Sequence, residues 1–218
     1  MNKEWSELNK TMQSQLKREE SFKDGIKTLF TLRNKLMDAM LSFRNELSRD
    51  DFDSMPFMNA DGYHSKNIAY SLWHIFRIED IVAHSLIQND EQIFFSGNYK
   101  ERTGSPIITT GNELEREQIA DFSRQLDLDQ LYSYISEVKD STESILKELP
   151  YSYLKKKMPP ESRGKLKELA VVSSDEKAEW LIDYWCGKDV SGLIKMPFSR
   201  HWIMHVEASL RIRTKLNK

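Results

Sequence analysis

The sequence predicts an all-α fold: a four-helix bundle with long connections and one extra short helix. Only 8 glycines and 6 prolines occur among 218 residues, so long segments run without a residue that interrupts a helix. Apolar residues in these segments recur at steps of three and four, the period of a helix with one buried face. We expect residues 1–218 to form a single helical-bundle domain, which this length permits.

Four long segments carry the helical period, and each predicts one helix of the bundle. The first stripe is interrupted by Arg33, and Pro150 ends the third helix. Residues 1–19 are expected to be helical but loosely attached. The four predicted helices cover about residues 20–47, 63–88, 128–149 and 198–216.

The extra short helix is predicted between Ser173 and Gly187. Ser173 and Glu176 have the spacing of a capping box, which favours a helix start at Ser173. Two connections, residues 89–112 and 158–196, are longer than a minimal bundle needs. Connections of this length usually serve a site or an interface.

Composition excludes several classes of protein. A formal net charge of -2 gives no general attraction to nucleic acid or to an anionic membrane, so we expect neither as a partner. The single cysteine, Cys186, excludes an intrachain disulfide framework and is expected to be a buried structural thiol. The polar N-terminal segment does not resemble a signal peptide, and no apolar run is long enough to span a bilayer. We therefore expect a cytoplasmic protein.

Two of the five histidines form a His-x-x-x-His pattern at His201 and His205. Residues four apart on a helix lie on the same face, so both imidazoles can reach one metal ion. Zinc proteases carry Glu after the first histidine of their motif, whereas this chain has Trp202 there. That difference excludes peptidase activity of the zinc-protease type. No glycine-rich phosphate loop and no G-x-S-x-G motif occurs either.

A third histidine, His74, lies in the middle of the second predicted helix on a largely apolar face. It is either a core histidine that hydrogen-bonds a neighbour or, if it faces the last helix, a third ligand. His64 and His84 are expected to be surface or cap residues. Acidic residues near these helices are expected in solvent or in ion pairs rather than as ligands. They are Glu79, Asp80 and Glu207.

The segment Trp73-His74, followed by Arg77-Ile78-Glu79-Asp80, and the pair His201-x-x-x-His205 at the start of the last helix resemble the DinB-like (DinB/YfiT-type) metal-binding four-helix bundles. The resemblance extends from about residue 20 to the end of the chain. It implies that His74, His201 and His205 bind one divalent metal ion, with zinc or nickel expected. Three histidine ligands leave a coordination position open for water or substrate.

For function, the resemblance implies a metal-dependent enzyme, such as a transferase that uses a small thiol, and a homodimer. Two alternatives remain open: a non-catalytic metal-binding or stress-response protein, and a helical interaction module without metal. Ser71 and Ser209 are one turn from ligands and are candidate partners for the second ring nitrogens, although core packing is the simpler role. The tryptophans are expected in the core, and those next to ligands could also wall the site. They are Trp73, Trp180, Trp185 and Trp202.

Overall fold

The computed structural model describes residues 2–217, and every regular element in that range is helical. Residues 2–217 contain no strand, only an isolated bridge between Lys157 and Asp189. The predicted all-α fold is therefore confirmed for the described chain. In chain order the elements are α1 (Lys3–Gln15), α2 (Glu19–Glu46), α3 (Arg49–Asp53), η1 (Gly62–Ser65), α4 (Ile68–Asp80), η2 (Ile81–Gln88), α5 (Ile93–Ser96), α6 (Tyr99–Thr103), α7 (Glu117–Gln125), α8 (Leu128–Glu148), η3 (Tyr151–Lys155), α9 (Ser162–Glu168), α10 (Glu176–Cys186), α11 (Val190–Lys195), η4 (Met196–Arg200) and α12 (His201–Leu216).

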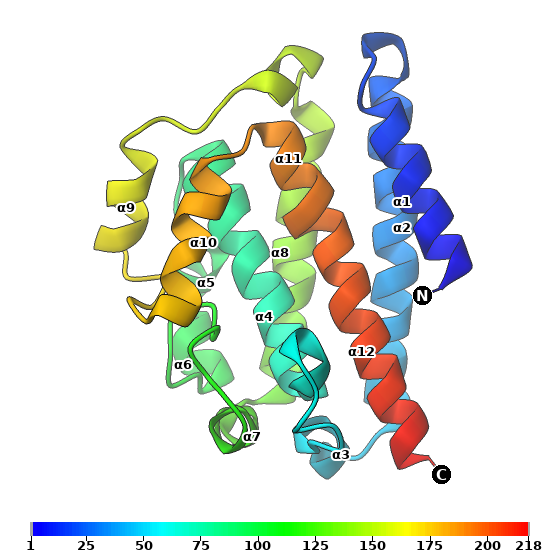
Figure 1. The fold of residues 1–218 in the computed structure, drawn as a ribbon, viewed down its shortest axis with the longest axis vertical. Helices are drawn as coiled ribbons and strands as arrows, with labels where there is room; N and C mark the ends of the chain where they lie inside the picture. The colour runs from blue at the N-terminus through cyan, green and yellow to red at the C-terminus, as the bar shows by residue number, and fades with distance from the viewer. Residues whose placement is uncertain (1, 218) are drawn as a thin grey trace.

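Four long helices form the centre of the molecule: α2, α4 with its continuation η2, α8 and α12 (Figure 1). Helix α4 packs against α8 and α12, and α2 packs against the same two helices, so the four close into a ring. All residues of α4 are buried, because the two long connections cover the side that the other long helices leave free. Across residues 2–217, no helix is both long and apolar enough to cross a membrane.

Helix α1 lies along the outer side of α2 (Figure 1). Trp5 and Met12 on α1, and Leu16 just after it, are buried. The helix expected in the segment 1–19 is present within its described residues 2–19; where loose attachment was expected, α1 packs against the bundle through these apolar side chains.

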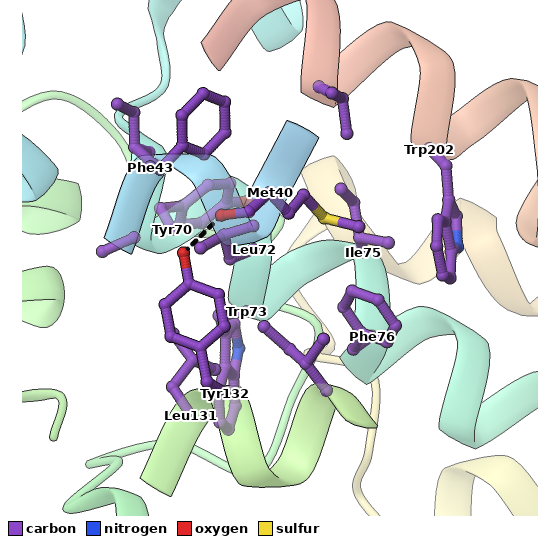
Figure 2. Packing of buried hydrophobic residues seen from close by; sticks show 14 of the residues in the cluster. Met40, Phe43, Tyr70, Leu72, Trp73, Ile75, Phe76, Leu131, Tyr132 and Trp202 are labelled. Carbon is purple, nitrogen blue, oxygen red and sulfur yellow. Dashed lines mark hydrogen bonds between the residues drawn. The ribbon is translucent and has the colours of Figure 1, made fainter. Parts of the chain in front are cut away.

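The core between the long helices combines aromatic and aliphatic side chains (Figure 2). The hydroxyl of Tyr132 on α8 donates a hydrogen bond of 2.7 Å to the backbone oxygen of Met40 on α2. The ring of Phe76 on α4 lies 4.6 Å, centroid to centroid, from that of Trp202 on α12. The first contact joins α8 to α2 and gives the buried hydroxyl a partner, and the second joins α4 to α12.

The connection over residues 158–196 folds into α9, α10 and α11; the short helix predicted from near Ser173 to Gly187 is confirmed as α10, although Ser173 is not its N-cap. Helix α10 begins at Glu176, and its cap is Asp175, whose side chain accepts a hydrogen bond from the backbone N–H of Lys177. Asp and Ser are comparable N-caps, and Asp175 takes this role two residues after Ser173. The π-helical turn η4 then leads directly into α12.

A buried polar cluster ties the four long helices together. Arg33 on α2 makes two hydrogen bonds to Glu79 on α4, at 2.7 and 2.9 Å, and one of 2.9 Å to Glu143 on α8. The indole N–H of Trp202 on α12 donates to the same Glu79 carboxylate at 2.8 Å. Arg33 and Glu79 are both 0% exposed, so the charge that interrupts the apolar stripe of α2 has a buried counter-charge.

Asp80, the next residue of α4, holds the connection over residues 89–112. Its carboxylate accepts hydrogen bonds from the backbone N–H groups of Ile93 and Phe94 and from the hydroxyl of Tyr134, all at 2.8–2.9 Å. Burial raises the pKa of this carboxyl, and Arg77 opposes that shift. Asp80 and Glu79 were expected in solvent or in ion pairs; both are fully buried and ion-paired.

We predict that Arg33→Met lowers the free energy of unfolding by about 3–5 kcal/mol, because it leaves the Glu79 carboxylate buried without its counter-charge. Urea denaturation followed by circular dichroism measures the change. The double variant Arg33→Met/Glu79→Met should recover part of the loss. The control is Arg44→Met, which removes a surface ion pair with Asp129 and should cost about 0–1 kcal/mol. A loss below 1 kcal/mol for Arg33→Met would contradict the role of the cluster.

Candidate metal centre

Three histidines meet between α4 and α12. His74 comes from the middle of α4, and His201 and His205 come from the first two turns of α12. One ring nitrogen of each lies within 4.8 Å of those of the other two. The ring centroids are 4.7–5.0 Å apart, and all three side chains are buried. The prediction that these residues come together is confirmed, and the three nitrogens are close enough to form a metal site.

The side chain of Trp202 determines how α12 is rotated about its own axis. Successive residues of a helix point about 100° apart, so Trp202 and His201 leave the helix in different directions. Trp202 is anchored inside the bundle by its hydrogen bond to Glu79 and by the Arg33 guanidinium, 4.2 Å from its ring centre. With that side chain fixed, His201 and His205 share the face of α12 that looks toward His74.

The second nitrogen of His74 has a defined partner. Its Nδ1 lies 2.7 Å from the backbone oxygen of Thr110, and because a carbonyl only accepts, Nδ1 carries the proton. The lone pair of the neutral ring is then on Nε2, the nitrogen left for a metal ion. The ring of Tyr70 stacks on His74, with centroids 5.3 Å apart and planes inclined by 15°. The 89–112 connection therefore orients His74.

The two serines proposed as ring partners do not fill that role. The Ser71 hydroxyl is buried and has no hydrogen-bond partner within residues 2–217. The Ser209 hydroxyl donates to the backbone oxygen of His205, not to its ring. The backbone carbonyl of Thr110 takes the role that was expected of Ser71. No sequence pattern identifies such a carbonyl.

The rings of His201 and His205 fit a metal ion because the Nδ1 atom of each lacks a protein partner within residues 2–217. Nδ1 of each is buried without a hydrogen bond to any residue of the described chain. A buried polar atom left in this state costs free energy, and a bound cation is one way to satisfy such a donor set. Two imidazole donors and the free Nε2 of His74 are a donor type that suits zinc, nickel, copper and iron.

The burial of the three rings also fixes their protonation. Desolvation lowers the pKa of His74 to about 4, against an ordinary value of 6.5. Desolvation and the neighbouring imidazoles lower the pKa of His201 and His205 well below that value. All three rings are therefore neutral near pH 7, which is the form that binds metal.

The remaining histidines lie outside this cluster. His64 is half-buried in η1, and its ring is 4.1 Å from that of Tyr63. The expectation that His84 is a surface or cap residue is wrong: its side chain is buried, with Nδ1 2.7 Å from Asp90 and Nε2 3.1 Å from the Ser141 hydroxyl.

This Ser141–His84–Asp90 chain has the connectivity of a hydrolase triad but not its surroundings. Ser141 lies within α8, where the backbone N–H groups are bound in the helix and cannot form an oxyanion hole. The chain instead ties η2 to α8. Glu207, the third acidic residue expected in solvent or an ion pair, is half-buried and accepts a hydrogen bond from the backbone of Asn2.

A cavity of about 800 Å³ opens onto the three histidines. Residues 58–63, 65 and 66 form one wall, Asn112, Glu115 and Arg116 border it, and α10 supplies an aromatic wall with Trp180 and Tyr184. The expectation that Trp180 is a core residue is wrong, since its side chain is 51% exposed. The connection over residues 158–196 therefore builds much of the cavity wall, whereas the connection over residues 89–112 contributes only Asn112.

Other tryptophans and the cysteine are structural. Trp73 and Trp202 are fully buried and are not among the residues that line the cavity, so neither walls it; Trp185 is buried and does line it. Cys186 is buried as predicted, and burial raises the pKa of its thiol. A thiol of this kind is a poor nucleophile.

We predict that metal-free protein loses stability as the pH falls from about 6.5 to about 4. In this window an unfolded histidine binds a proton and His74 does not, so the unfolded state takes up more protons and is favoured. His74 alone contributes roughly 3 kcal/mol. Urea denaturation of metal-free wild type and of His74→Asn, whose amide can still donate to Thr110, measures the effect. Equal slopes for the two proteins across this pH range would contradict the assignment.

The chain matches no protein-family model, and no curated protein matches its sequence. The chemistry of the centre is therefore inferred from its own donor atoms, burial and cavity.

Proposed function

We propose that this chain is a DinB-like four-helix bundle that binds one divalent metal ion, zinc or nickel, through His74, His201 and His205. We further propose that it is a metal-dependent transferase that joins a small thiol to an electrophile. The observation that carries the proposal is the meeting of three buried, neutral imidazoles, with ring nitrogens within 4.8 Å, on the wall of a cavity of about 800 Å³.

The donor set supports an open site over a closed one. Structural zinc sites are closed by four protein ligands, whereas catalytic sites have three and leave a position for substrate. The three histidines are the only group of His, Cys, Asp or Glu side chains in residues 2–217 that meets the spacing of a metal site. A cavity of this size accommodates a small molecule, which a purely structural site does not need.

A divalent ion held here would lower the pKa of a substrate thiol and so supply a thiolate near pH 7. The thiolate forms a carbon–sulfur bond to the electrophile while the bond to the leaving group breaks; the leaving group departs with the electron pair, and the thiol proton passes to solvent. The protein contributes position and exclusion of water. Trp180 and Tyr184 offer apolar surfaces against which an electrophile can pack, and Tyr63 borders the histidine face.

We predict that protein purified without a histidine tag holds one equivalent of zinc or nickel per chain. His205→Ala should weaken binding by at least roughly 100-fold, since loss of even an outer partner of a ligand costs 10–100-fold. Elemental analysis and competition with a chromogenic chelator measure content and affinity. The matched control is His64→Gln, a histidine next to the cluster but outside it, which should bind metal like the wild type. Protein that binds no metal, or equal affinity in wild type and His205→Ala, would contradict the metal site.

We also predict that the metal-loaded protein accelerates transfer of 3-mercaptopropionate to 1-chloro-2,4-dinitrobenzene, in which the thiolate displaces chloride. The rate enhancement should disappear in His205→Ala and after removal of the metal with a chelator, and it should return when zinc is added back. The absorbance of the thioether product measures the rate. A protein that holds one metal ion and gives the same rate with and without it would favour the non-catalytic alternative.

A further inference from the structure

Lys66 is a cation on the cavity wall without a carboxylate partner. It lies between η1 and α4, is partly buried, and lines the same cavity as the three histidines. Its ammonium donates to the backbone oxygen of Leu114 at 3.2 Å. Within residues 2–217 it forms no ion pair. An ammonium has three N–H donors, so two remain for a ligand.

The neighbouring acidic side chain is already engaged. Glu115 also lines the cavity, but its carboxylate pairs with Lys177 at 3.0 Å. Burial lowers the pKa of Lys66, and the charge on Glu115 offsets only part of that shift. A partly buried ammonium that lacks a counter-ion is costly, and an anionic ligand group would relieve that cost.

The position of Lys66 relates it to the metal centre. Its ammonium lies 5.0 Å from the centre of the Tyr70 ring, and the same ring stacks on His74 with centroids 5.3 Å apart. The charge of Lys66 also acts on both His74 and His205. A group bound to Lys66 is thus one aromatic ring away from the histidines, a span that a short thiol can bridge between its sulfur and a terminal anion.

We propose that Lys66 binds a carboxylate of the thiol substrate, so that the site selects small thiols that carry a carboxylate over neutral ones. This inference rests on the proposed function, because it requires the sulfur to lie at the metal. The aromatic wall formed by α10 is then left for the electrophile. Lys66 acts here as a specificity residue and not as a ligand.

The test uses protein loaded with cobalt, whose absorption spectrum reports the binding of a thiolate. Two probes are titrated: 3-mercaptopropionate and its methyl ester, which differ in the negative charge. Wild type should bind the carboxylate probe roughly 10–100-fold more tightly, the range of a hydrogen bond to a charged group. Lys66→Met should abolish this preference, and Lys66→Arg, which keeps the cation, should retain most of it.

Lys167→Met is the matched control, since it removes an exposed lysine that pairs with Glu179 and leaves Lys66, Glu115 and Lys177 in place, and it should keep the preference. Equal affinity of wild type for the two probes, or a preference that survives in Lys66→Met, would overturn the inference. Cobalt content is measured before any thiol is added and should be the same in wild type and Lys66→Met. Wild type that takes up no cobalt would overturn the proposed function, and this inference with it. Cobalt uptake without discrimination would overturn this inference alone.

Discussion

The buried cluster of Arg33, Glu79 and Trp202 is the constraint on which the site depends. A charged pair that is 0% exposed is stable only with good geometry and full hydrogen bonding, and here the Glu79 carboxylate is bonded by a guanidinium and an indole from two other helices. Rotating α12 would break the indole bond inside the bundle. The cluster therefore fixes which face of α12 carries His201 and His205. The cluster also fixes the rotation of α4, because Glu79 belongs to that helix. Since His74 leaves α4 in a different direction from Glu79, holding Glu79 in the cluster also sets where His74 points.

The two long connections complete the histidine site that the four long helices form in part. The bundle brings the imidazoles together, but Thr110, from the connection over residues 89–112, sets the tautomer of His74. The insert over residues 158–196 adds α10 and its aromatic wall. The protein thus buries its histidines deeply enough to keep them neutral, yet leaves a cavity open beside them. In such an arrangement the connections that form the cavity walls can vary while the helices that carry the histidines stay the same.

The sequence predicted those features that depend on local periodicity. Apolar spacing identified the four long helices, and the four-residue step from His201 to His205 placed both rings on one face. Features that depend on contacts between distant segments were missed. His84 was expected at the surface because its position on the helix wheel differs from that of His74, yet α8 covers it with Ser141. Arg33 offered a clue that could have been used: a charge inside an apolar stripe requires a buried partner, and Glu79 was available. No such clue pointed to the Thr110 carbonyl or to the exposure of Trp180, which depend on the path of irregular chain.

The central claim, that three imidazoles bind one ion, is tested most directly by X-ray absorption at the zinc edge of protein loaded with one equivalent of zinc. The account predicts a first shell with three imidazole nitrogens at about 2.0–2.1 Å, with the outer-shell scattering that histidine rings produce, and one fewer imidazole in His205→Ala. A shell of water oxygens alone, a sulfur ligand from Cys186, or a spectrum unchanged in His205→Ala would contradict it.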